Sequence, residues 1–208
     1  MAKGGSGLGV GPHGAGMENK ESGVRVKSSH PLTDAISTGG GSFANEVMNT
    51  RDAMEREYGP AVKNMNLHLA KFDNNSALGA YGDDTLYMNE NALKNKNLTE
   101  AMQSGAASGF HPGIGDKTGA EAVAAHEIGH RLGQIAAQRA GISEQEIVNR
   151  AAKKVGISTP NMAGHISQYA RTNYGETIAE ASSDVYCNGS KASKASIAIM
   201  NEVKSILK

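Results

Sequence analysis

The sequence of 208 residues has no tryptophan, a single cysteine and only 4% aromatic residues. One cysteine excludes an internal disulfide, and the shortage of large rings predicts a core built from Ala, Val, Ile, Leu and Met. Basic and acidic residues are equal in number, at 21 each, and no basic cluster points to a nucleic-acid partner. No apolar run is long enough to span a membrane, and no hydrophobic signal peptide is visible at the N-terminus. We therefore expect a soluble protein of a reducing compartment, and a buried, unreactive thiol at Cys187.

The chain is expected to form one domain over residues 31–208, after a flexible, glycine-rich arm over residues 1–30. Apolar spacing predicts a helix over 42–58, ended by Gly59-Pro60, and a closing helix over 192–207. Alternation predicts strands over 65–70 and 85–89.

The richest motif is His126-Glu127-Ile128-Gly129-His130, an HExxH pattern. On a helix, residues four apart share a face, so the two imidazoles can bind one metal ion. Glu127 can then act as general base on the water at the open coordination position, which is the core of a zinc peptide hydrolase.

The residues around the motif favour a helix. Thr118 or Asp116 can cap it, and the alanine-rich segment 119–125 contains no proline. Apolar residues at helical spacing predict one core-facing flank, and Ala124 and Ala125 suggest that another element packs closely there.

A zinc hydrolase of this type needs a third protein ligand. The metzincin pattern places a third histidine where this chain has Ala136, so that class is excluded. The remaining source is a glutamate from a later helix, and Glu176, Glu180 and Asp184 lie four residues apart on nearly one helix face.

With this second block the sequence resembles a known family. Residues His126 to His130, Ser167 to Asn173 and Glu176 to Ala181 are similar to the catalytic domain of anthrax lethal factor, the Pro-Pro endopeptidases and small metallopeptidase-like domains of tailed phages and prophages. The resemblance covers roughly residues 78–190. It implies that His126, His130 and Glu176 bind Zn²⁺, that Glu127 is the base, that Tyr169 stabilises the oxyanion and that Glu180 orients a histidine ligand. Thr177-Ile178 stand where the family has two aromatic residues, so the packing beneath the metal is expected to differ.

A second register stays open. Glu180 and Asp184 also look like the thermolysin pattern, in which a glutamate ligand is followed four residues later by an orienting aspartate. The Glu176 register is preferred because only it gives Tyr169 a matching offset. Both registers define a gluzincin.

The resemblance implies a mostly helical, zincin-like α+β fold with a small sheet beside the HExxH helix. In gluzincins the strand before this helix holds an extended peptide, and Leu86, Tyr87, Met88 and Asn89 are the candidates here. His111, in the loop 109–113, could form part of a substrate wall, although a tight loop ordering the helix entry explains it as well.

The expected function is a zinc-dependent peptide hydrolase, phage- or prophage-encoded, acting on a peptide or protein substrate. It would work in the host cytoplasm or as part of a virion. The alternative is a structural or assembly protein of a phage head or neck that retains a metallopeptidase-like fold and binds phage structural proteins. The complete HExxH favours the hydrolase, because a module kept only for its shape does not need Glu127.

Overall fold

A computed structural model describes residues 17–19, 24–34, 41–74, 76–91 and 98–208. The fold is mostly helical α+β with a small mixed sheet, as the sequence predicts. The strands are β1 (Met17–Asn19), β2 (Val24–Pro31), β3 (Asn66–Phe72), β4 (Gly79–Gly82) and β5 (Thr85–Asn89). The longer helices are α2 (Gly41–Tyr58), α5 (Leu98–Ala107), α6 (Gly119–Ala140), α7 (Glu144–Val155), α9 (Tyr174–Asn188) and α10 (Lys194–Leu207). Short helical turns are α3 (Pro60–Lys63), α8 (Thr159–Met162), η1 (Ala163–His165), η2 (Tyr169–Arg171) and η3 (Gly189–Lys191).

The sheet has the strand order β1-β2-β3-β5-β4. β3 and β5 run parallel, while the other neighbouring pairs are antiparallel. β5 therefore has a paired strand on both sides, and β4 lies at the end of the order nearest α6.

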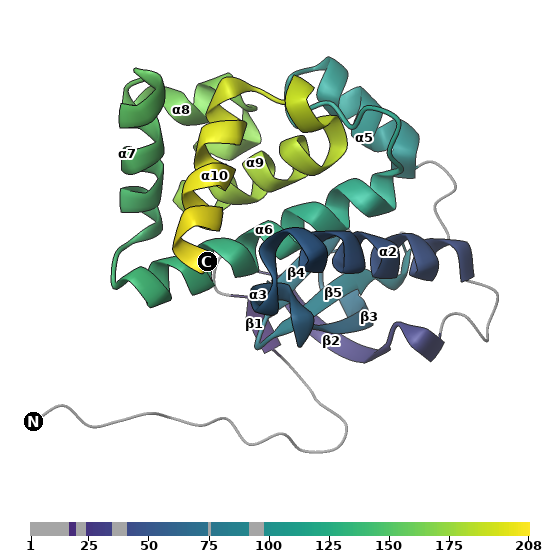
Figure 1. Cartoon of the computed structure of the whole chain (residues 1–208). Coiled ribbons are helices and arrows are strands. Elements are labelled where there is room, and N and C mark those ends of the chain that lie inside the picture. Colours follow the sequence, from purple (N-terminus) through teal and green to yellow (C-terminus); the bar gives the residue numbers. More distant parts are fainter. Residues whose placement is uncertain (1–16, 20–23, 35–40, 75, 92–97) are drawn as a thin grey trace, which may run out of the picture.

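α6 is the central element of the fold. It lies between the sheet with α2 on one side and the helices α9 and α10 on the other (Figure 1). Ile128 and Leu132 are completely buried in the main core, and Val123 is nearly so. The apolar stripe predicted from the sequence thus packs α6 into the core, and the other faces of this helix can carry the residues of a site.

Arg131, next to the second motif histidine, fastens the β4–β5 hairpin to α6. Its guanidinium donates to the Tyr81 hydroxyl at 3.0 Å, to the Asp84 carboxylate, and to the carbonyl of Ala61 at 2.5 Å. Asp83 and Asp84 both have positive φ, at 47° and 56°, as the central residues of a two-residue type I′ hairpin require. The hairpin is consequently held at a fixed position along the helix.

The predicted boundary of the N-terminal arm at residue 30 is wrong. Residues 24–31 form β2, and Val24 and Val26 are buried because their alternation places both on the face that packs against Phe72, Ala80 and Tyr87. Residues 17–19, also predicted as part of the arm, form β1, and residues 1–16 and 20–23 lie outside the described part of the chain.

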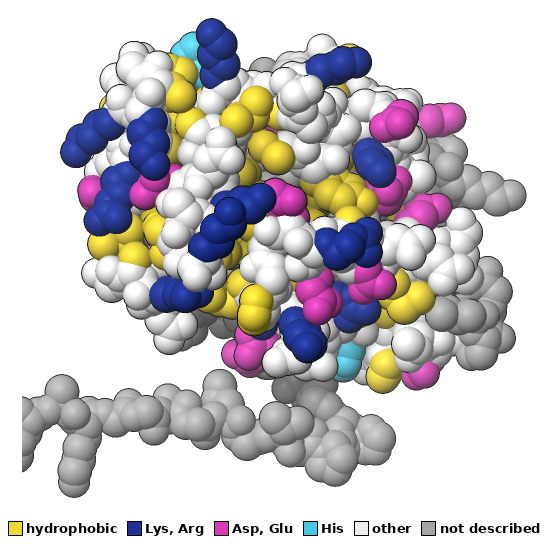
Figure 2. Space-filling view, viewed as in Figure 1, with side chains coloured by type: hydrophobic (Ala, Val, Ile, Leu, Met, Phe, Trp, Pro, Cys, Tyr) yellow, Lys and Arg dark blue, Asp and Glu magenta, His cyan; other side chains and the backbone are white. Residues whose placement is uncertain are grey.

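The remaining elements follow the sequence reading closely. The helices over 42–58 and 192–207 and the strand over 85–89 are present within two residues of their predicted limits. The other predicted strand, over 65–70, is β3, which extends to Phe72. Among the described residues, no helix combines the length and apolar character needed to cross a bilayer. On the face seen in Figure 2, basic and acidic side chains are interspersed.

Candidate metal centre

α6 presents the two motif histidines one turn apart. The Thr118 hydroxyl caps the helix by accepting from the Glu121 N–H at 3.2 Å, and the Glu121 carboxylate accepts from the Thr118 N–H at 2.9 Å. This capping box fixes the first turn. The rings of His126 and His130 then lie with centroids 5.0 Å apart, and their side chains are only 14% and 7% exposed.

α9 brings the first of its three acids to these rings. The Asn173 side chain caps α9 by accepting from the Glu176 N–H at 2.8 Å, which places Glu176 in the first turn. Its Oε2 atom lies 3.1 Å from His126 Nε2 and 3.5 Å from His130 Nε2. One ligand atom from each of these three residues lies within 4.8 Å of the others, and no other such group occurs among the described residues. The cluster can therefore hold a metal ion.

Close contact between α6 and α9 makes this meeting possible. A methyl group added at Gly129 would lie 2.8 Å from Ala179 Cα and 2.6 Å from Ser182 Cβ, so glycine is required there. The hydroxyls of Ser182 and Ser183 donate to carbonyls of α6, at 2.8 Å and 3.1 Å. The close packing that Ala124 and Ala125 suggested is the approach of α9.

Glu180 lies behind the histidines as a shared acceptor. Its Oε1 atom is 2.9 Å from His126 Nδ1, and its Oε2 accepts from the Ser167 hydroxyl at 2.7 Å. His111 Nδ1 lies 3.2 Å and 3.3 Å from the two oxygens. Burial raises the pKa of Glu180, but the hydrogen bonds from His111 and His126 outweigh it and lower the pKa to about 2. Glu180 is therefore a carboxylate that orients His126 through the ring nitrogen facing away from Glu176.

Asp184 lies away from the histidines. Its two oxygens accept from Asn188 Nδ2 and from the Ser193 N–H, each at 2.9 Å, so it ties the end of α9 to the start of α10. In the thermolysin register this aspartate would orient a histidine. The geometry matches the Glu176 register instead.

Glu127 and Tyr169 both lie near the histidines, in contact with different elements. Glu127 is 7% exposed, and its carboxylate packs on β4, where a methyl group at Gly79 would come within 2.8 Å of Oε1. Tyr169 stacks on His126 with a centroid distance of 6.1 Å, and its hydroxyl donates to Glu176 Oε1 at 3.3 Å. Burial first, and then the charges of Glu176 and Glu127, raise the pKa of Tyr169, so the phenol keeps its proton at neutral pH.

These groups line one cleft of about 400 Å³. Its walls also include residues from the loop before β4 and from the loop before α6, namely Asn74, Ser76, Ala77, Leu78, Phe110 and His111. None of the four predicted substrate residues Leu86, Tyr87, Met88 and Asn89 lines the cleft, so that prediction is wrong. The reason is sheet order, since β5 is paired on both sides and buried along its whole length.

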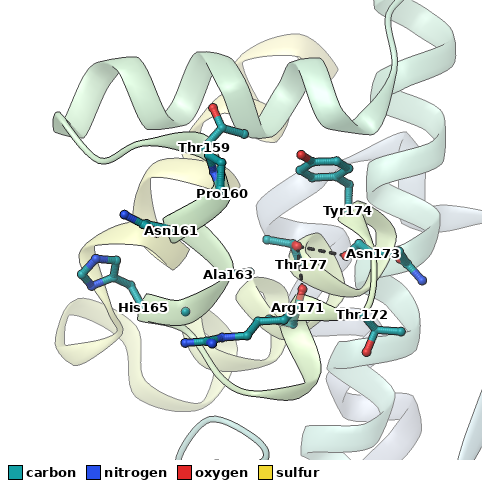
Figure 3. Close-up of a pocket in the computed structure, with 12 residues that line it drawn as sticks. Thr159, Pro160, Asn161, Ala163, His165, Arg171, Thr172, Asn173, Tyr174 and Thr177 are labelled. Atoms are coloured by element: carbon teal, nitrogen blue, oxygen red, sulfur yellow. Dashed lines mark hydrogen bonds between the residues drawn. The ribbon is translucent and has the colours of Figure 1, made fainter.

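A second cavity, of about 540 Å³, lies on the other side of the η2 turn (Figure 3). Its lining includes the polar residues Asn161, His165, Arg171, Asn173 and Tyr174, and no Asp or Glu of the described ranges belongs to it. The Thr177 hydroxyl beneath it donates to the carbonyls of Ala170 and Asn173. This cavity shares no lining residue with the metal cleft.

The sequence leaves two roles open for His111 and indicates no role for Ser167 or Gly79. Only the approach of distant segments gives these residues their contacts, and no local pattern signals it. Cys187 is buried as expected, and burial raises its pKa to about 12. Comparison of the chain with protein-family models, with curated proteins and with solved structures gives no match.

Proposed function

We propose that this chain is a zinc-dependent peptide hydrolase of the gluzincin type. The observation that carries the proposal is the convergence of His126 Nε2, His130 Nε2 and Glu176 Oε2 within one cleft, with Glu127 beside them. Two imidazoles and one carboxylate are the ligand set of a catalytic zinc site that keeps a position for water.

The chemistry of the three atoms fits a divalent cation. Glu176 Oε2 is buried, and within the described chain it accepts no regular hydrogen bond, although both Nε2 atoms face it. Burial opposes the charge of Glu176, but contacts with His126 and His130 lower its pKa, so the carboxylate is ionised at neutral pH. Nitrogen and oxygen donors in this number suit zinc among the first-row metals. When bound, zinc would polarise the scissile carbonyl and make water more acidic.

The chain's own residues would supply the proton transfers. Glu127 lines the cleft and is placed to accept a proton from the attacking water and to pass it to the leaving amine. Tyr169 keeps its proton and lies over His126, where its hydroxyl can turn from Glu176 to the developing oxyanion.

An extended peptide would lie along the segment that leads into β4, in place of the β5 residues first expected. Ser76, Ala77, Leu78 and Gly79 line the cleft beside Glu127. Asn89 supports this wall from behind, because its side-chain amide donates to the carbonyl of Ala77 at 2.7 Å. The substrate class is therefore a peptide or an unfolded protein segment that can enter the cleft extended.

The test combines metal analysis with a peptide-library digestion. Native mass spectrometry of the zinc-supplied protein is expected to show one zinc per chain, and digestion of the library should give new N-termini. Glu127→Gln is the matched control, since it should keep the zinc while the rate falls by about a hundredfold or more.

Three results would contradict the proposal. A wild-type protein that takes up no zinc has no metal site of this kind. A zinc-loaded wild type that cleaves nothing is not a hydrolase, and this outcome favours the assembly alternative. Cleavage that continues unchanged in Glu127→Gln would show that the protein does not use this base.

A further inference from the structure

His111 is the residue of the cleft whose role the proposed function does not explain. It lies in the loop between α5 and α6, 69 residues before Glu180, yet its ring contacts this acid behind the metal cluster. Its Nδ1 atom is 3.2 Å and 3.3 Å from the two oxygens of Glu180. The Glu180 side chain is only 2% exposed, while that of His111 is 20% exposed.

The loop holds this ring in a defined place. The N–H groups of Phe110 and His111 both donate to the carbonyl of Gly105 in α5, at 2.8 Å and 3.3 Å. A methyl group at Gly105 would come within 3.0 Å of His111 Cδ2, so glycine makes room for the ring. The Phe110 carbonyl accepts from the Tyr169 N–H at 3.1 Å, which ties the loop to the second block.

Glu180 thus has three partners with different tasks. Ser167 holds Oε2, His126 meets Oε1, and His111 reaches both oxygens from the side of the cleft. A carboxylate that accepts from His126 Nδ1 leaves Nε2 of that ring free to bind a metal. The rotation of the Glu180 carboxylate plane determines how well Oε1 accepts from His126 Nδ1. His111 is the partner that contacts both oxygens.

We propose that His111 is a positioning residue, which donates from Nδ1 to Glu180 and thereby holds His126 in the tautomer and orientation that bind the metal. The inference rests on the proposed function, because it assigns His111 a task toward the same metal centre. A purely structural role, in which the ring only fills space beside Phe110 and Tyr169, would need its shape and not its nitrogen.

Three substitutions separate these roles. His111→Phe keeps a planar ring without a nitrogen, and His111→Asn places an amide nitrogen near the position of Nδ1. His111→Gln places it farther out, near the position of Nε2. His165→Phe is the matched control, since His165 is exposed and lines the other cavity (Figure 3).

The measurement is titration of the metal-free proteins with Co²⁺, followed by its visible absorption, which reports affinity and ligand geometry without any substrate. Loss of an outer carboxylate partner typically costs about ten- to a hundredfold in metal affinity, so we expect His111→Phe to lose about tenfold and to change the spectrum. His111→Asn should recover wild-type affinity to within about threefold, and His111→Gln should resemble His111→Phe. The His165→Phe control should match the wild type in both readouts.

Two results would overturn the inference: equal affinities and spectra for the wild type and His111→Phe, or equal losses of affinity in His111→Asn and His111→Gln. If His111→Phe does not fold, judged by circular dichroism, the comparison of His111→Asn with His111→Gln decides alone. Failure of the wild type to bind Co²⁺ or Zn²⁺ would instead refute the proposed function, so the two failures are distinguishable.

Discussion

The two cavities of this protein differ in how exposed their ionisable side chains are. The second cavity is the larger, at about 540 Å³ against about 400 Å³, but His165 and Arg171 on its rim are exposed. In the metal cleft, by contrast, His130 and Glu176 are buried and face one another, and the buried Glu180 contacts His126. Burying ionisable groups costs free energy unless they are paired, and such clusters are typical of functional sites. Convergence of buried ionisable groups, rather than cavity size, therefore distinguishes the candidate metal centre from the second cavity.

The largest effect is expected from the acids of α9. Glu176→Ala removes a direct ligand and should weaken zinc by more than about a hundredfold, whereas Glu180→Ala should cost about ten- to a hundredfold. Asp184→Ala should leave zinc binding unchanged, because its oxygens serve Asn188 and Ser193. It should still lower stability by about 1–3 kcal/mol, since two partly buried donors lose their acceptor.

Competition with a chelator ranks the zinc affinities of these three variants, and thermal unfolding gives their stabilities. The reverse ranking, with Glu180→Ala devoid of zinc and Asp184→Ala impaired, would move the site to the thermolysin register.

The pH dependence of folding stability should differ between the metal-free and the zinc-loaded protein. Burial lowers the pKa of His126, but Glu176 and Glu180 together raise it well above 6.5. In the metal-free protein the contacts of protonated His126 with Glu176 and Glu180 stabilise the fold fully below pH about 6.5. This stabilisation is lost as the pH rises through the raised folded-state pKa of His126. The lowered pKa of Glu180 adds stability that is present above pH about 4.3 and is lost as the pH falls toward about 2.

Zinc must displace the proton of His126, so its binding strengthens as the pH rises. The difference in melting temperature between loaded and metal-free protein should therefore grow from pH 6 to pH 8. A constant difference over this range would show that no proton leaves the site on binding. Glu176→Ala, which should bind little zinc, is the control and should show almost no difference at either pH.

A moderate effect is expected at the contact of α6 with α9. Gly129→Ala places a methyl group 2.6 Å from Ser182 Cβ and should destabilise the fold by about 1–3 kcal/mol, partly offset by about 1 kcal/mol of helix propensity. Because α9 carries Glu176, zinc affinity should fall with stability. Gly113→Ala is the control, since apart from Gly113 and its two chain neighbours no atom of the described residues lies within 4 Å of the added carbon. Chemical denaturation and zinc titration of both variants check this, and equal stability would mean that the helices have room to spare.

The smallest effect is expected in the second cavity. Arg171→Ala, like the His165→Phe control, should leave zinc affinity within about twofold of the wild type, because exposed charges contribute little at a distance. Zinc titration at two salt concentrations checks this. A large loss would mean that this cavity and the metal cleft are coupled through the η2 turn.

The helical state of the motif segment and the core-facing flank of α6 could be predicted, and Thr118 is one of the two N-caps that the sequence offered, because capping residues and a 3.6-residue period are local features of the chain. The β4 strand could not, since Gly79–Gly82 is short and carries neither β-branched residues nor alternation. The choice of β5 as the substrate strand failed for a related reason. β5 is buried along its whole length because it lies inside the sheet, and the order of the strands cannot be predicted from the sequence of one strand.

The sequence by itself determined the absence of an internal disulfide and the pairing of His126 with His130 on one helix face, while its resemblance to a known family implied the α+β fold. The first two follow from the cysteine count and from a spacing of four residues, which fixes relative positions within a single helix. Only the tertiary structure decided which acid of α9 meets the histidines, that Ser76 to Gly79 line the cleft, and that His111 reaches Glu180. Each of these depends on the approach of segments tens of residues apart, and packing at positions such as Gly129 and Gly105, rather than local periodicity, fixes how close they come.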